Sequence, residues 1–419
     1  MAHPENPERA QRGKLTVTAS AAHLWLLAVS LALLLPMLGC SRFHPKPRPE
    51  YVYVLGKQTY LRDRVAAVSN RTATVTNGQR LQVLEHGRRF LRVQTAKGEI
   101  GWLEERTVAP QSVEAGFAWL QRDHASDPTV ATAILRDELY MHVKPGRDTD
   151  KLYLLPENEK LQLLVRASVE KNASGAKPLV RSPAAATEPS TAANTAHPTS
   201  TTPAEAAPEP PPMEDWWLAR DSQGHTGWLL GRRMDVDVPD DLTKYSEGQR
   251  IVGAYVLATV HDPDIDQTAA GGNIKEYVTV LSAPRDGLPY DFDQVRVYTW
   301  NLKKHRYETA YRERDIEGFL PVTLKDGSPY AAPNAATNAN PQFTIRIAPA
   351  DAGPILTDPV TGISRPAKLI EKSFQLEGNV VRRILPPGQT ASQQPAEAHP
   401  EPLPGKKAKA AAAHRKHRK

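Results

Sequence analysis

One short pattern occurs twice in this chain of 419 residues: K-G-E-I-G-W-L at Lys97–Leu103 returns as Q-G-H-T-G-W-L at Gln223–Leu229. In both copies a step that contains glycine, Thr95–Gly98 or Asp221–Gly224, stands between two apolar blocks. Such steps are typical of the tight turns of β-hairpins. The pattern therefore predicts a hairpin whose second strand begins Gly-Trp-Leu.

Three further blocks precede each copy of this pattern, in the same order. They are Leu61–Asp63, Leu81–Leu84 and Phe90–Val93 in the first copy, and Leu135–Asp137, Leu161–Leu164 and Trp217–Arg220 in the second. Each apolar block has the composition of a strand, and four blocks in one order are not expected by chance. The sequence therefore predicts two copies of one β module.

The order of these blocks, with a closing Gly-Trp-Leu strand, resembles the bacterial SH3 domain (SH3b), a small five-stranded β-barrel. The resemblance covers residues Tyr51–Ala109 and Ala131–Val238. It implies two small barrels of a kind that commonly attaches its chain to cell-wall peptides or to protein partners. The first copy departs from the family pattern at Val65–Val68, where V-R-S is usual, and at Phe90. No ligand pocket is therefore carried over from the family.

The second copy contains an insertion rich in Ala, Ser, Thr and Pro, from about Val169 to Pro212. With almost no large apolar residue it cannot bury a core, so we expect it to be disordered. It falls between two strands, where a loop tip accepts insertions at little cost in stability. Between the copies, residues 110–130 form the expected connector, because Val113, Phe117 and Leu120 have helical spacing.

After Pro239 a third region begins that resembles neither copy and no family that we recognise. Strands are expected at Ile251–Val260, Glu276–Ser282, Gln294–Trp300, His305–Tyr311, Phe319–Thr323, Phe343–Ile347, Lys368–Leu376 and Val380–Ile384. These predict an antiparallel β domain over residues 248–384, sandwich-like or similar to a few propeller blades. The predicted fold class is all-β: two small barrels, then this domain, then a disordered Pro-rich and basic tail over residues 385–419.

The N-terminus has the layout of an exported protein. A leader with three basic residues precedes the apolar run Leu24–Leu35, and small residues follow. The ending Leu38-Gly39-Cys40 resembles the lipobox of bacterial lipoproteins, which implies a signal peptide over residues 1–39, lipid attachment at Cys40 and a tether over residues 40–50. An uncleaved membrane helix over Ala21–Gly39, or a soluble secreted form, remains open. With Ser41 after the cysteine, the resemblance favours the outer membrane in a bacterium that has two.

The formal net charge of +6 belongs mostly to the tail. Seven basic residues and no acid lie between Lys406 and Lys419, and without them the net charge is −1. Such a tail favours anionic surfaces, here lipid headgroups or cell-wall carboxylates, or is merely solvated. We expect partners at the membrane, in peptidoglycan or among envelope proteins, and no nucleic acid.

The sequence nominates no catalytic residue and no cofactor. Cys40 is the sole cysteine, so a lipidated Cys40 excludes cysteine peptidases and internal disulfides. Three carboxylates alternate in His261–Asp266 as in a calcium loop, but Gln267 stands where the EF-hand pattern needs Gly. We therefore expect an exposed turn there and no metal.

The aromatic residues supply the candidate ligand-binding site. Adjacent strand residues face opposite sides of a sheet, so Trp216 faces outward if Trp217 enters the core in register with Phe90. Tyr140 and Tyr153, from the variable loop of the second copy, are expected to lie with Trp216. The three residues form the predicted ligand-facing surface.

Two functions are compatible with these features. The first is a non-enzymatic envelope lipoprotein that tethers or scaffolds through its SH3b-like modules, which suits weak multivalent contact. The alternative is a cell-wall hydrolase whose active site lies unrecognised in residues 248–384, because SH3b domains often accompany such enzymes.

Overall fold

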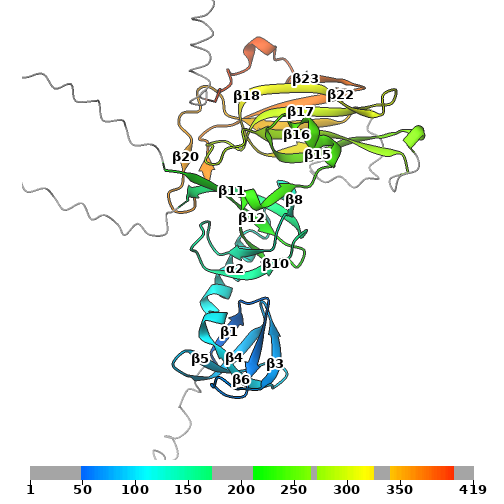
Figure 1. The fold of residues 1–419 in the computed structure, drawn as a ribbon. Helices are drawn as coiled ribbons and strands as arrows, with labels where there is room; N and C mark the ends of the chain where they lie inside the picture. Colours follow the sequence, from blue (N-terminus) through cyan, green and yellow to red (C-terminus); the bar gives the residue numbers. More distant parts are fainter. Residues whose placement is uncertain (1–48, 172–210, 266–270, 325–339, 401–419) are drawn as a thin grey trace, which may run out of the picture. The chain divides into compact units, whose positions relative to one another are not determined.

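The structure is a computed structural model that describes residues 49–171, 211–265, 271–324 and 340–400. From Glu50 on, these residues belong to one compact unit. They form three seven-stranded antiparallel sheets, a two-stranded ribbon and few helices, so the predicted all-β class is confirmed (Figure 1). Cys40, most of the insertion and the basic end of the tail lie outside the described residues. Within the described ranges, no helix is long and apolar enough to span a membrane.

The first sheet is built on the first repeat, and its strands lie in the order β3-β2-β6-β5-β4-β1-β7. Their bounds are β1 Tyr51–Val54, β2 Gln58–Arg62, β3 Arg71–Thr76, β4 Arg80–His86, β5 Phe90–Gln94, β6 Ile100–Glu104 and β7 Val108–Pro110. Alternate residues such as Leu61, Leu91 and Leu103 point inward and form a core of their own. The sheet therefore has its own hydrophobic core.

The second sheet repeats this plan in the order β10-β9-β13-β12-β11-β8-β14. Its strands are β8 Ala131–Leu135, β9 Leu139–His142, β10 Lys151–Leu155, β11 Lys160–Glu170, β12 Met213–Arg220, β13 Thr226–Leu230 and β14 Met234–Val236. Each strand of the first sheet corresponds to the strand numbered seven higher in the second sheet, as β1 corresponds to β8. The sequence repeat is therefore also a repeat of the strand order. Both sheets have seven strands where the resemblance implies five, and β7 and β14 are only three residues long.

The glycine of each Gly-Trp-Leu block sits where the closing strand passes close to its neighbours. A Cβ on Gly101 would lie 2.6 Å from Thr72 Oγ1 and 2.7 Å from Leu61 Cβ. A Cβ on Gly227 would lie 2.7 Å from Phe117 Cε1. The repeated glycine is therefore required by close packing in both sheets.

Helix α2, Gln111–Asp123, connects the first two sheets, as the spacing of its apolar residues predicts (Figure 1). Val113, Phe117 and Leu120 are its buried residues, and it contacts β1 and β7 on one side and β10 and β13 on the other. The helix thus packs against both sheets.

The third sheet runs continuously in the order β15-β16-β17-β18-β19-β22-β23. Its strands are β15 Arg250–His261, β16 Asn273–Ser282, β17 Phe292–Asn301, β18 Arg306–Leu324, β19 Gln342–Ile347, β22 Ile370–Glu377 and β23 Val380–Ile384. The two strands expected within 305–323 are one strand, β18, whose first part pairs with β17 and whose end pairs with β19. A short helix, α3 Asp240–Thr243, precedes the sheet.

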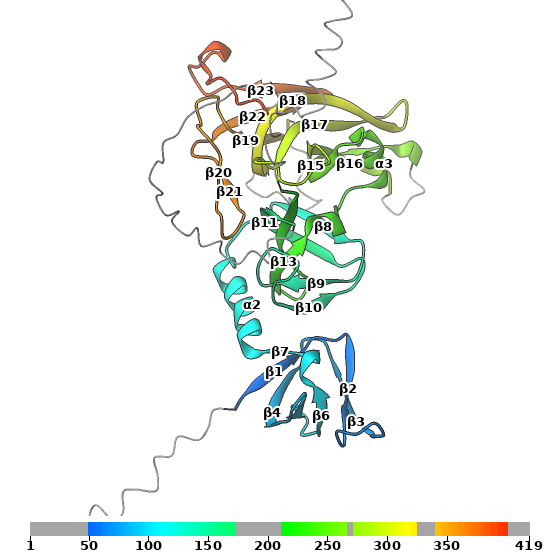
Figure 2. The same ribbon diagram turned by 60° about the vertical axis from the view of Figure 1, so that its left-hand side comes forward.

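A small ribbon, β20 Leu356–Thr357 and β21 Ser364–Arg365, extends from the third sheet to the second (Figure 2). The Ser168 amide of β11 donates a 2.8 Å hydrogen bond to the carbonyl of Gly362. The core of the second sheet is also continuous with that of the third. The second and third sheets therefore share one interior.

Two predicted boundaries need correction. Strand β11 continues through Glu170, which pairs with Met213, so the insertion begins later than Val169. Residues 385–400, which the sequence assigns to a disordered tail, pack on the third sheet. The Glu397 carboxylate lies 2.7 Å from Nζ of the buried Lys372, and Glu397 also forms a β-bridge with Pro349. The segment is held by Lys372 inside the sheet, a contact that the proline content of the segment does not indicate.

We predict that Gly101→Ala destabilises the first sheet by about 1–3 kcal/mol, the usual cost of overpacking, because the new methyl overlaps Thr72 and Leu61. Urea denaturation of the variant, followed by circular dichroism, should show the loss. Gly56→Ala is the matched control: its Cβ would meet only the Gln58 carbonyl oxygen at 3.8 Å. Equal midpoints for both variants would contradict the close-packing argument.

Candidate functional site

Trp216 is buried, with 2% of its surface exposed, so the prediction of an exposed ligand-facing tryptophan is wrong. The alternation holds: Trp217 enters the core of the second sheet and Trp216 points to the other side. That side is covered, because Leu120 of α2 and Ile363 of the ribbon pack in the same cluster as Trp216. The neighbours that bury Trp216 lie far from it in sequence.

The register behind that prediction was also one residue off. Trp102 pairs with Arg92 in the first sheet, and Trp228 pairs with Leu218 in the second. Phe90 therefore corresponds to Trp216, and Leu91 corresponds to Trp217. The sequence contains a sign of this register, because Trp102 follows Phe90 by the same spacing as Trp228 follows Trp216.

Tyr140 and Tyr153 lie where the second sheet meets the first, away from Trp216. The hydroxyl of Tyr140 donates to the Leu55 carbonyl at 2.9 Å. The ring of Tyr153 stacks on His225 with ring centres 3.8 Å apart, and burial raises the pKa of Tyr153 to about 12. The structure therefore does not bring the three predicted residues together; both tyrosines are used in packing between modules.

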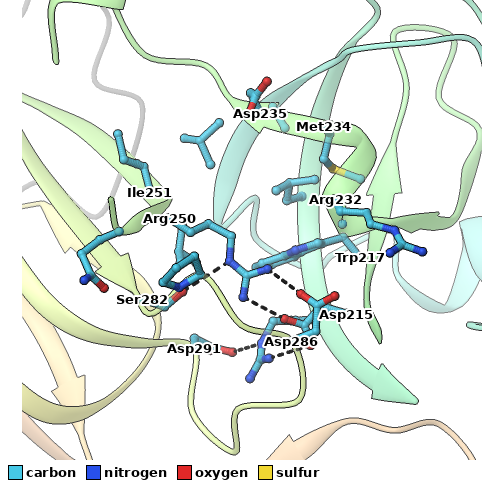
Figure 3. A pocket seen from close by; sticks show the side chains of 18 of the residues that line it. Asp215, Trp217, Arg232, Met234, Asp235, Arg250, Ile251, Ser282, Asp286 and Asp291 are labelled. Carbon is cyan, nitrogen blue, oxygen red and sulfur yellow. Dashed lines mark hydrogen bonds and ion pairs between the residues drawn. The ribbon is translucent and has the colours of Figure 1, made fainter. Parts of the chain in front are cut away.

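A cavity of about 540 Å³ opens instead where the second sheet meets β15 and the loop after β16 (Figure 3). Its apolar wall includes Trp217, Met234 and Ile251. Two ion pairs line it as well, Arg136 with Asp235, and Arg250 with Asp286 at 2.8 Å. Apolar surface with a few polar groups of fixed position is typical of ligand sites.

A buried charge network forms one end of this cavity. Asp215 is 2% exposed and accepts from Ser168 Oγ at 2.5 Å, Arg250 Nη2 at 3.2 Å and the Gly287 amide at 3.0 Å. Arg166 of β11 pairs with Asp215 at 3.3 Å and with Asp291 at 2.9 Å. The second sheet supplies Arg166, Ser168 and Asp215, and the third region supplies the rest, so the network joins the two.

Electrostatics keep this network charged. Burial alone would lower the pKa of Arg166, but Asp291 and Asp215 together raise the pKa above its ordinary value. Arg166 also donates to the carbonyls of Leu288 and Tyr290, at 2.8 and 2.6 Å. Every charge at this end of the cavity therefore has partners, an arrangement suited to holding a shape.

Glu214, beside Asp215, anchors a second pair of arginines. Its buried carboxylate accepts two bonds from Arg147, at 2.8 and 2.7 Å, and one from Arg232 at 2.5 Å. Sequence reasoning missed these residues, although a signal was present: two acids stand directly before Trp216 within a buried strand. Charges in such a position need partners, because an unpaired buried charge is very costly.

His142 of β9 is buried beside Trp216, with the two rings edge to face and their centres 5.2 Å apart. Its Nδ1 lies 2.9 Å from Thr149 Oγ1. Burial, and next the charge of Lys151, lower the pKa of His142 to about 4. The imidazole is therefore neutral near pH 7.

The carboxylates expected as an exposed turn lie beside His305. Ligand atoms of Asp262, Asp264 and His305 lie within 4.8 Å of one another, the one such group among the described residues. The Asp262 side chain is buried and already accepts from Trp300 Nε1 at 2.7 Å and His305 Nδ1 at 2.8 Å. Both bonds lower the pKa of Asp262, and the bond from Trp300 has the larger effect. They also join the end of β15 to β17 and to the turn between β17 and β18.

Comparisons with known proteins give weak similarities. No protein-family model matches the chain, and no curated protein matches it. Among solved structures, NlpC2 from Trichomonas vaginalis matches at 9% identity and a TM-score of 0.13, over 46% of this chain and 49% of that one. An NlpC/P60 family protein from Bacillus cereus matches at 12% identity and a TM-score of 0.19, over 50% of this chain and 65% of that one. NlpC1 from Trichomonas vaginalis matches at 7% identity and a TM-score of 0.13, over 65% of this chain and 91% of that one.

The chain thus spans about half the length of the first of these structures and 65% of the second. All three TM-scores are below 0.2. The similarities therefore assign neither a family nor an activity to this chain.

We predict that the second sheet loses stability as the pH falls from 6.5 to 4. The pKa of His142 is about 4 in the folded chain and about 6.5 when unfolded, so the unfolded state takes up the proton first. The pKa difference of about 2.5 units corresponds to about 3 kcal/mol. Urea denaturation at a series of pH values measures this loss.

His142→Gln should make the stability of the second sheet depend less steeply on pH over that range, whatever its stability at pH 7. Thr149→Val is a useful companion, since it removes the bond to Nδ1 and keeps the titrating ring. An unchanged pH dependence in His142→Gln would show that carboxylates, rather than this histidine, control acid stability.

Proposed function

We propose that the chain is a non-enzymatic lipoprotein of the cell envelope that tethers or scaffolds through two SH3b-like modules. The repeated strand order, with a close-packed glycine in the Gly-Trp-Leu block of each copy, supports two copies of one module. Binding without covalent chemistry suits the cavity beside the second sheet, whose buried charges are held in mutual pairs. Its ligands in this proposal are cell-wall peptides or protein partners.

The observation that carries the proposal is the cavity at Trp217, because it combines an apolar wall with groups of both charges. A cell-wall peptide also carries both charges, on amino and carboxylate groups. The exposed pair Arg136 and Asp235 could each exchange its partner for a ligand group of the same charge. Trp217 and Met234 would contact the apolar parts of such a peptide.

The anchor of the proposed tether is Cys40, with export to the periplasmic face of a membrane. It rests on the apolar run Leu24–Leu35 and the Leu38-Gly39-Cys40 ending. The proposed setting makes envelope polymers and proteins the accessible partners.

We predict that residues 50–419, which contain all the described cores, co-sediment with purified peptidoglycan. The variant Arg136→Gln/Asp235→Asn should bind about tenfold more weakly, the effect of losing about 1.5 kcal/mol of charge-assisted hydrogen bonding. Lys368→Gln/Asp351→Asn is the matched control, since it removes another exposed ion pair away from the cavity.

Release of soluble wall fragments is scored in the same assay. Release by the unchanged protein would overturn the non-enzymatic proposal and favour the alternative, a hydrolase within residues 248–384. Absence of co-sedimentation would remove cell-wall peptides as the ligand and leave protein partners.

Cys40→Ser is expected to move the mature chain out of the membrane fraction or to block its processing, because serine offers no sulfur for lipid attachment. Fractionation and the mass of the N-terminal peptide measure both effects. A Cys40→Ser chain that is cleaved and membrane-bound like the unchanged one would disprove lipid attachment at this residue.

A further inference from the structure

Four adjacent strands of the first sheet align one row of residues across its outer face. Arg62 on β2 pairs with Arg71 on β3 and with Trp102 on β6, and Trp102 pairs with Arg92 on β5. The three arginines are exposed and Trp102 is partly exposed. We call these four residues the arginine row.

The row is unfavourable for the folded chain alone. Like charges directly opposite each other on neighbouring strands destabilise a sheet. Among the described residues, neither Arg62 nor Arg71 has a carboxylate within ion-pair distance: Arg62 donates to Ser69 Oγ at 2.9 Å, and Arg71 lies 3.9 Å above the ring of Tyr60. Arg92 is 3.6 Å from Glu85. An anionic partner would relieve this repulsion.

The second sheet shows what the same row becomes when the protein itself covers it. The corresponding residues are Lys151, His142, Trp228 and Leu218, in the same register. Trp228 is 4% exposed, and Leu218 and His142 are buried as well. Lys151, the counterpart of Arg71, stays exposed and charged, whereas the other three positions of the row are buried and carry apolar or neutral side chains in the second sheet.

An exposed apolar loop extends from the end of this row. It joins β2 to β3, so Arg62 precedes it and Arg71 follows it. Val65 is 50% exposed and Val68 is 82% exposed, with Ala66 and Ala67 exposed between them. Arginines that flank an exposed apolar loop have the chemistry of a bilayer interface, where cations meet phosphates and apolar groups enter the acyl region.

The net charge also differs between the first module and the rest of the folded chain. Residues 51–110 hold ten basic and five acidic side chains, whereas residues 111–405 hold thirty basic and thirty-nine acidic ones. The nearly neutral body is thus a basic first module followed by an acidic remainder. An anionic surface would attract the first module and repel residues 111–405.

We propose that the arginine row and the loop at residues 63–70 bind the surface of an anionic lipid bilayer. Arg62, Arg71 and Arg92 pair with headgroup phosphates, and Trp102 lies at the interface, which amphipathic aromatic rings favour. A nucleic acid or an acidic peptide could use the arginines but would leave Val65 and Val68 in water. The lipid surface accounts for both features.

The setting of this second membrane contact rests on the proposed anchor at Cys40. The ten residues from Ser41 to Glu50 span at most about 35 Å when extended, so an anchored chain keeps the first module close to the bilayer. The contact would fix the orientation of the first module, which a flexible tether alone leaves open.

Residues 50–405 lack Cys40, the apolar run and the basic tail after Gly405, so their binding to vesicles tests the row separately from the anchor and from the tail. We expect them to sediment with phosphatidylcholine vesicles that contain phosphatidylglycerol, more weakly as salt rises, and not with phosphatidylcholine alone. Arg62→Gln/Arg71→Gln/Arg92→Gln should bind of order 100-fold more weakly, from about 1 kcal/mol, or about fivefold, for each basic residue.

Lys97→Gln/Lys171→Gln/Lys303→Gln is the matched control, because it removes three exposed positive charges away from the row and should bind nearly as the unchanged protein does. A thermal melt of each variant checks the fold. A second measurement uses the fact that residues 50–405 contain no cysteine: Val68→Cys, labelled with a polarity-sensitive dye, should shift to shorter wavelength on anionic vesicles.

The proposal is overturned if the arginine variant binds like the control, if neutral vesicles bind equally well, or if the dye at residue 68 stays in a polar environment. Binding of polyglutamate or single-stranded DNA through the row, without vesicle binding, would also overturn it. Failure in this assay leaves the Cys40→Ser experiment untouched, so the two proposals fail separately.

Discussion

The buried contact between Arg166 and two aspartates, Asp215 and Asp291, is the constraint on which the relation between the second and third sheets depends. Removing one partner of such a pair usually costs more than the pair contributes, because the other charge is left buried without compensation. The contact joins β11 and β12 to the loop at residues 283–291, and its three residues line the cavity at Trp217.

This constraint explains which parts of the structure the sequence could predict. The repeat, the strands and α2 follow from local patterns: period-two alternation, glycine at a close approach, and helical spacing of Val113, Phe117 and Leu120. Trp216 shows the limit, since its alternation was predicted correctly while its burial depends on Leu120 and Ile363. A residue's face is a local property, and what covers that face is not.

The site was harder to predict for the same reason. Arg166 and Asp291 are 125 residues apart, and no spacing rule connects them. Glu214 and Asp215, two acids within a buried strand, were the available sign that charged partners must come from elsewhere. The ordered segment 385–400 was missed similarly, because it is held by Lys372 from inside the third sheet. Charged contacts over long sequence distances decided each of these features.

The covered outer face of the second sheet has a consequence for modularity. Cut from its neighbours, this sheet would expose Trp216, Leu218 and Trp228 as one apolar surface, and such surfaces promote aggregation. The first sheet has a separate core and polar contacts with the second, such as Asn77 with Leu152 and Leu154. Of two modules with one strand order, the first carries a core of its own, while the second is a fixed part of the architecture around it.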